Sequence, residues 1–265
     1  MTRVLSGAAL LAIAVALVWF ASATIFFLVA EALLLLSFGE YAALARASGV
    51  SIPELPSALA AGLTAAAFSR LAFNVPWVSM DIVLMSAFVV LGGLTLARWK
   101  SGPDALALAS ASVFPCFYLG LPIGAMMVIR EVEGREVLFL LMLTVAASDT
   151  AQYYTGRAFG RRPLAPAISP KKTIEGAVGG FLIGPAFLAV VGAWWLPAAT
   201  VALRVVLGVA IVAVGIVGDL FESMLKRSAG VKDSSALIPG HGGILDRLDA
   251  LLFAAPVYYI LLKYV

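Results

Sequence analysis

Acidic side chains near the end of the chain have a spacing suited to binding a metal ion. Asp219, Glu222 and Ser223 stand at i, i+3 and i+4, which places them on one face of a helix. Asp246 and Asp249 are also three residues apart. Mg²⁺ prefers oxygen ligands, and in proteins one or two carboxylates usually hold it together with substrate phosphates and water. The two sets of carboxylates therefore predict a divalent metal site.

The segment between these carboxylates is suited to holding phosphate oxygens. The cations available for this are Lys226, Arg227, Lys232 and Arg247. The run Pro239-Gly240-His241-Gly242-Gly243 is flexible enough to bring backbone N–H groups close to a ligand. It contains the only histidine of the chain. One histidine does not make a His-based zinc site, so zinc is not expected.

A second polar stretch extends from residue 148 to residue 176. Asp149 lies in an apolar run, where a carboxylate is costly unless a metal, a substrate or a nearby arginine pairs with it. Thr173 is suited to capping the next helix. Lys171 and Lys172 then stand just before the helix N-terminus, where free N–H groups attract anions. The alternative is that the two lysines only fix the topology at a membrane surface.

Membrane helices must position these motifs, because the chain is too apolar for a soluble domain. It is 62% hydrophobic and 12% charged, whereas soluble domains are about 25% charged. A bilayer-spanning helix needs about 20 mostly apolar residues. Candidate spans lie near 4–21, 23–39, 56–73, 80–97, 105–128, 137–155, 175–196, 199–221 and 248–264. We therefore expect an all-α integral membrane protein of about nine transmembrane helices, with N-terminal helices in 1–140 and a catalytic region in 141–265.

The distribution of Lys and Arg predicts the orientation. With the N-terminus in the cytoplasm and the C-terminus outside, 13 of the 18 basic residues lie inside, as the positive-inside rule expects. Both motif-bearing loops, 156–174 and 222–247, then face the cytoplasm. Because the basic residues lie in short loops between apolar runs, we do not expect a nucleic acid partner. For Glu31 and Glu40, in the first half of the chain, a packing or interfacial role is favoured over a functional one.

From residue 223 to residue 249 the sequence resembles the phosphatidate cytidylyltransferases, also called CDP-diacylglycerol synthases. The family signature is carried without departure by Ser223, Lys226, Arg227, Lys232, Asp233, Pro239, His241, Gly242, Gly243, Asp246, Arg247 and Asp249. The stretch from Asp149 to Gly176 is also similar to the family, whereas the first 140 residues match only as apolar helices. The resemblance implies that phosphatidate and CTP react, with Mg²⁺, to give CDP-diacylglycerol and pyrophosphate. We expect the site on the cytoplasmic side of the bacterial inner membrane.

Roles follow from this resemblance together with the residue types. The expected metal ligands are Asp219 and Asp246, with Asp249, Glu222 and Asp149 in addition. The expected catalytic residues are Asp219, Asp246, Lys226 and Arg247. The expected substrate-binding residues are Lys171, Lys172, Thr173, Ser223, Arg227, Lys232, Asp233, His241, Gly242 and Gly243. A second cation and a homodimer in the lipid bilayer stay open.

The competing hypothesis is a membrane transporter for an ion or a solute. Spans interrupted by glycine and proline, with buried carboxylates, would suit such a pathway. This hypothesis does not explain why the acidic and basic clusters gather on one side of the membrane.

Overall fold

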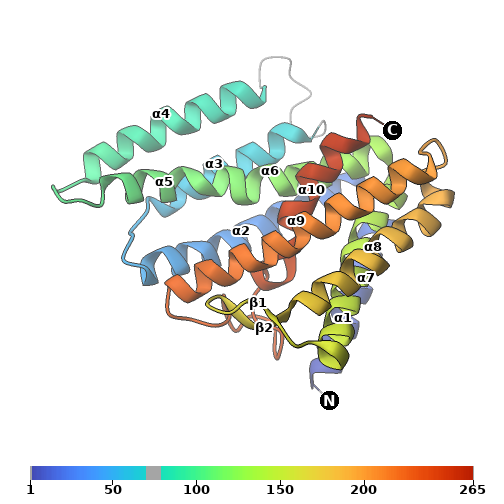
Figure 1. The fold of residues 1–265 in the computed structure, drawn as a ribbon. Coiled ribbons are helices and arrows are strands. Elements are labelled where there is room, and N and C mark those ends of the chain that lie inside the picture. Colours follow the sequence, from blue (N-terminus) through green and yellow to red (C-terminus); the bar gives the residue numbers. More distant parts are fainter. Residues whose placement is uncertain (1, 70–78, 265) are drawn as a thin grey trace.

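The computed structural model describes residues 2–69 and 79–264, which form a bundle of helices and one small hairpin (Figure 1). The helices of the first half are α1 (Thr2–Phe20), α2 (Ala23–Ala47), α3 (Glu54–Phe68), α4 (Met80–Arg98), α5 (Ala105–Pro115) and α6 (Leu121–Val128). Those of the second half are α7 (Arg135–Phe159), α8 (Ile174–Trp195), α9 (Val201–Ser228) and α10 (Leu245–Leu262). Two π-helical turns, η1 (Cys116–Gly120) and η2 (Ile129–Glu133), make the stretch from α5 to residue 133 continuous.

Each of the nine predicted spans overlaps with a helical stretch of the described residues. Within the described ranges, six stretches are long and apolar enough to cross a membrane: α2, α4, the stretch Ala105–Glu133, α7, α8 and α9. Of the others, α3 has 15 residues and α10 carries charges in its first turns. The end of the span predicted at 56–73, with Arg70, lies outside the described residues. The architecture is that of a helical membrane protein, and the nine-span count stays a prediction.

The loop before α8 contains the part of the structure that is not helical. Strands β1 (Pro163–Ala165) and β2 (Ser169–Thr173) pair antiparallel and form a short hairpin, which the sequence did not predict, in a chain that is otherwise helical as expected. Pro170 explains the difference, because the residue before a proline is pushed toward extended backbone. Thr173 caps α8 as predicted, with its Oγ1 accepting the N–H of Gly176 at 3.1 Å. The hairpin thus ends directly on the N-terminus of α8.

Small residues let the helices of the second half approach closely. A Cβ added at Gly179 of α8 would lie 2.1 Å from Oγ1 of Thr155 in α7. A Cβ added at Gly218 of α9 would lie 2.5 Å from the backbone oxygen of Asp249 in α10. Contacts of this kind are typical of helix packing in membranes, where glycine allows backbones to touch. The second contact brings the acidic ends of α9 and α10 together.

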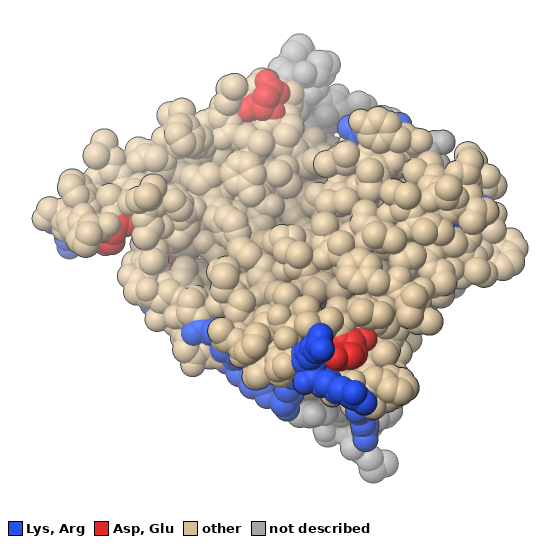
Figure 2. Space-filling model, viewed as in Figure 1, with Lys and Arg blue, Asp and Glu red and all other residues tan. Residues whose placement is uncertain are grey.

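The polar segments gather at one end of the bundle. α1 begins at this end, the β1–β2 hairpin lies there, and α10 ends at the opposite end (Figure 1). Lys and Arg side chains cluster along the edge that carries the hairpin, while most of the rest of this face is uncharged (Figure 2). The two motif-bearing segments therefore meet at the basic end of the molecule.

Candidate active site

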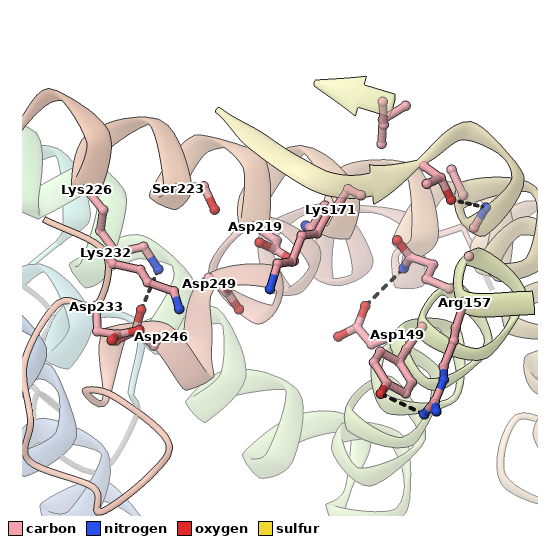
Figure 3. A pocket seen from close by; sticks show the side chains of 18 of the residues that line it. Asp149, Arg157, Lys171, Asp219, Ser223, Lys226, Lys232, Asp233, Asp246 and Asp249 are labelled. Atoms are coloured by element: carbon pink, nitrogen blue, oxygen red, sulfur yellow. Dashed lines mark hydrogen bonds and ion pairs between the residues drawn. The ribbon is translucent and has the colours of Figure 1, made fainter. Parts of the chain in front are cut away.

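The two polar stretches of the sequence enclose one cavity of about 640 Å³ at the basic end of the bundle (Figure 3). Of the predicted site residues, its lining includes Asp149, Lys171, Lys172, Thr173, Asp219, Ser223, Lys226, Arg227, Lys232, Asp233, Asp246, Arg247 and Asp249. Four predicted residues do not line it: Glu222, His241, Gly242 and Gly243. Gln152, Tyr153 and Arg157 of α7 line it without having been predicted.

Three carboxylates in the cavity come from three different helices. Asp149 stands on α7, Asp219 on α9 and Asp249 on α10, and Figure 3 shows Asp219 and Asp249 between Asp149 and Asp246. Lys172 forms an ion pair with Asp219. Asp149 accepts a hydrogen bond from Gln152 Nε2 at 3.0 Å, again through one oxygen. Carboxylate oxygens like those of Asp149, Asp219 and Asp249 are the ligands that a hard cation such as Mg²⁺ prefers.

Free carboxylate oxygens remain in this cluster. Asp249 Oδ1 accepts the N–H of Ala250 at 2.7 Å. Considering the described residues alone, Oδ2 of Asp249 and Oδ2 of Asp149 accept no hydrogen bond. In that same part of the chain, no group of three or more His, Cys, Asp or Glu is compact enough to hold a metal by itself. Mg²⁺ does not require such a cage, because substrate phosphates and water usually complete its coordination.

Lys226 connects two carboxylates on neighbouring helices. Its Nζ lies 2.5 Å from Oε2 of Glu222 and 2.5 Å from Oδ1 of Asp246. Glu222 is fully buried, so it balances the lysine charge and does not face the cavity. The helix spacing explains this difference from the prediction. Residue i+3 is turned about 60° away from residue i, whereas Ser223 at i+4 stays closer to the face of Asp219.

Asp246 is held firmly within the protein. Its Oδ2 accepts the N–H of Ser234 at 2.9 Å, the hydroxyl of Ser234 at 2.7 Å and the N–H of Gly243 at 2.7 Å. Burial would raise the pKa of Asp246, but hydrogen bonds from Lys226, Gly243 and Ser234 outweigh it and lower that pKa to about 2. Asp246 is therefore a carboxylate that organises the loop before α10 as well as a candidate ligand.

Several cations of the cavity remain available for an anion. Within residues 2–69 and 79–264, Lys171, Lys232 and Arg247 form no ion pair. Arg227 has a different position, because its Nε donates to the carbonyl of Ile168 at 3.3 Å and fastens the hairpin to the end of α9. The free cations, together with the carboxylate cluster, could hold two phosphate-bearing ligands around a metal ion.

Sequence reasoning missed the part that Glu40 of α2 plays in this site. The carboxylate is almost fully buried, with 6% of the residue exposed. Oε1 accepts the hydroxyl of Ser235 at 2.6 Å and the N–H of Ile244 at 3.0 Å. Oε2 accepts the N–H of Leu245 at 2.7 Å and lies 3.0 Å from Oγ of Ser234, whose single hydroxyl hydrogen it shares with Oδ2 of Asp246. Glu40 thus fixes both ends of the loop that contains the His-Gly-Gly run.

The only available signal for Glu40 was its place at the end of an apolar run, where carboxylates are often functional. Glu31 has the same signal but lies elsewhere. A Cβ added at Gly62 of α3 would be 3.1 Å from Oε2 of Glu31, and Glu31 does not line the cavity.

The glycines of the His-Gly-Gly run allow the loop to close on these carboxylates. A Cβ at Gly243 would lie 2.2 Å from Oγ of Ser234 and 2.3 Å from Oε1 of Glu40. Gly242 has a φ of +78°, and its Cβ would lie 2.5 Å from Oδ2 of Asp246. His241 points toward α1, where its Nε2 would be 3.5 Å from a Cβ at Gly7. None of the three residues of the His-Gly-Gly run lines the cavity.

Comparison with known proteins assigns the chain to a family. A family model described as the cytidylyltransferase family matches residues 1–265. The phosphatidate cytidylyltransferase of Haemophilus influenzae is 49% identical over 131 residues, covering 48% of this chain and 45% of the relative. That of Aquifex aeolicus is 40% identical over 151 residues, covering 57% and 56%, and that of Brucella suis biovar 1 is 35% identical over 214 residues, covering 73% and 74%. The chain spans about half the length of the first two relatives. Because the family model matches residues 1–265 of this chain, the chain belongs to the cytidylyltransferase family.

Proposed function

We propose that this protein transfers a cytidylyl group from CTP to phosphatidate, giving CDP-diacylglycerol and pyrophosphate. The observation that carries this proposal is the cavity at the end of membrane helices, where Lys171, Lys232 and Arg247, which form no ion pair with any described residue, line the same space as a group of carboxylates. The names of the relatives supply the substrate class. Family membership gives no support to the transporter hypothesis.

The reaction needs alignment and charge neutralisation more than covalent help from the protein. An oxygen of the lipid phosphate attacks the α-phosphorus of CTP, the bond between the α-phosphorus and its bridging oxygen breaks, and pyrophosphate leaves. Lys171 and Lys172, next to the N-terminus of α8, would hold phosphates of one substrate. Lys232 and Arg247, on the opposite segment of the cavity, would hold those of the other. The lipid tails would stay among the membrane helices while the lipid phosphate enters the cavity.

The donor set fits Mg²⁺. Asp219 and Asp249 lie on helices that touch at Gly218, and Asp149 supplies a third carboxylate in the same cavity. These residues would hold the ion together with substrate oxygens, and Asp246 would contribute while keeping Lys226 and the loop in position. When bound, Mg²⁺ neutralises the negative charge that collects on the phosphates. Ser223 and Thr173 line the same space and can donate hydroxyl hydrogen bonds.

The nine-span topology belongs to this proposal. With the N-terminus in the cytoplasm, the basic end of the bundle faces the compartment that contains CTP, in agreement with the bias of Lys and Arg. The protein would lie in the bacterial inner membrane, where lipid reaches the cavity from the side. The basic edge in Figure 2 supports this orientation.

The test is turnover by the purified, full-length protein in detergent micelles. With CTP, phosphatidate and Mg²⁺ we expect release of pyrophosphate and formation of CDP-diacylglycerol in equal amounts. Omission of phosphatidate or replacement of CTP by ATP should stop both. Ion or solute flux in liposomes without pyrophosphate release would refute the proposed enzymatic function and support the transporter hypothesis.

A further inference from the structure

A second cavity lies next to the site and has the opposite chemical character. It measures about 280 Å³ and lies among α1, α2, α6, α7 and α10. Its lining consists of aliphatic, aromatic and thioether side chains, with one charged residue, Arg247. Arg247 also lines the polar cavity, so this single side chain stands at the boundary between the two spaces.

The first turns of α10 separate the two cavities. Asp246 and Asp249 line the polar one, whereas Leu248 and Leu251 line the apolar one. Each pair is three residues apart, so each forms a stripe along one side of the helix. The helix therefore presents carboxylates to one space and leucines to the other, with Arg247 between them.

The chemistry of the apolar cavity selects its occupant. Water needs two to four polar partners, and apart from Arg247 at its edge the lining of this cavity has only apolar side chains. An empty cavity of this size would leave its walls without dispersion contacts, which is unfavourable. Ile13 of α1 belongs to the lining and is 62% exposed, so the cavity reaches the outer, lipid-facing side of the bundle. A hydrocarbon chain that enters from the bilayer satisfies all three conditions.

We propose that the apolar cavity binds an acyl chain of the lipid substrate, while Arg247 holds the phosphate of the same molecule at the edge of the polar cavity. The inference rests on the proposed function for the identity of the lipid. A phosphate attached to hydrocarbon needs a cation beside an apolar space, and Arg247 provides this junction. The chain in the cavity fixes the position of the attacking phosphate, so substrates with chains too short to fill it should react less efficiently.

The variant that tests this proposal is Ala14→Trp. Ala14 is a half-buried residue of α1 in the lining, and an indole there would fill the cavity without touching the polar site. Ala16→Trp is the matched control, because Ala16 is exposed on the same helix and does not line the cavity. Both are compared on dipalmitoyl and dihexanoyl phosphatidate, measuring kcat/KM for each lipid and KM for CTP.

We expect Ala14→Trp to lower kcat/KM for dipalmitoyl phosphatidate by about tenfold, the effect of losing a few buried methylene contacts. Its value for dihexanoyl phosphatidate and its KM for CTP should stay within a factor of two of the wild type, and Ala16→Trp should change none of them. An unchanged ratio between the two lipids in Ala14→Trp would overturn the proposal. Absence of turnover by the wild type with either lipid would instead refute the proposed function.

Photocrosslinking of the wild-type protein decides the question independently of turnover and of variant folding. The probe is phosphatidate with a diazirine in the middle of one acyl chain. We expect adducts on the segments 13–18 and 248–251, and competition by unlabelled dipalmitoyl phosphatidate but not by dipalmitoylglycerol, which lacks the phosphate for Arg247. Adducts spread over the lipid-facing helices, or not reduced by phosphatidate, would show that no acyl chain binds in this cavity.

Discussion

Replacement of Glu40 by glutamine tests how the site is assembled. Each oxygen of the Glu40 carboxylate accepts one backbone N–H and lies within hydrogen-bond distance of one hydroxyl. In Glu40→Gln, one oxygen becomes an NH₂ group whichever way the amide is turned. The hydroxyl facing that group can rotate and accept from it, but the backbone N–H of Ile244 or Leu245 cannot. One buried N–H therefore loses its acceptor.

The size of the effect follows from these contacts. A hydrogen bond to a charged acceptor contributes about 1.5–3 kcal/mol, and a buried unsatisfied group costs about 1–3 kcal/mol. We expect the closed arrangement of the loop 234–245 to lose about 3 kcal/mol, which corresponds to roughly a hundredfold in an equilibrium. Since the same loop supplies three of the hydrogen bonds to Asp246 Oδ2, kcat/KM for CTP should fall by up to this factor.

The assay is pyrophosphate release at varied CTP, with proteolysis of the loop as a readout of its closure. Glu31→Gln is the matched control, because Glu31 is on the same helix and its buried Oε1 has no hydrogen-bond partner among the described residues. Glu31→Gln should keep wild-type turnover, whereas Glu40→Gln should lose activity and be cut faster. Turnover within a factor of two of the wild type in Glu40→Gln would refute the reasoning.

Three further predictions concern the cavity and its sidedness. Asp249→Asn should raise the Mg²⁺ concentration for half-maximal turnover by at least about tenfold, since even outer partners of metal ligands have effects of this size; an unchanged Mg²⁺ titration would exclude Asp249 as a ligand. Replacement of both Lys171 and Lys172 by arginine should keep membrane insertion but lose turnover, because Lys acts as a compact charge and Arg as a wider fork; wild-type kinetics would show that the pair serves topology. Single cysteines at Ala165 and Ser228, in a protein without its natural cysteine, should react with an impermeant reagent only after cells are opened, and CTP should slow the reaction at Ser228; labelling of either in intact cells would refute the orientation.

Local sequence patterns predicted the parts of the site that depend on neighbours in the chain. Thr173 caps α8 because the cap depends on the next three residues. The positions of Lys171 and Lys172 before this helix, and of Asp246 and Asp249 in the first turns of α10, likewise depend only on residues close by in the sequence. The hairpin β1–β2 was missed because its strands are very short and one of them contains Pro170.

Contacts between distant segments could not be predicted from patterns of this kind. Glu40 and its partner Ser234 are 194 residues apart, so nothing beside Glu40 in the sequence indicates the loop that it holds. Glu222 shared a predicted face with Asp219, but the packing of Lys226 and α10 on that side buries it. His241 and its glycines are typical of ligand-binding loops, yet here Gly242 is explained by its close approach to Asp246, and Gly243 by its close approach to Ser234 and Glu40.

The hydrogen bonds between Glu40 of α2 and the loop 234–245 also determine when the site can form during synthesis of the chain. During synthesis, α2 leaves the ribosome long before Ser234, Ser235, Ile244 and Leu245 exist. At about 5–20 residues per second, the Glu40 carboxylate waits on the order of 10–40 s for its donors. The cavity can therefore close only when nearly the whole chain has been translated, and a nascent chain that stops before residue 234 carries the lysines of the hairpin without the loop that completes the site.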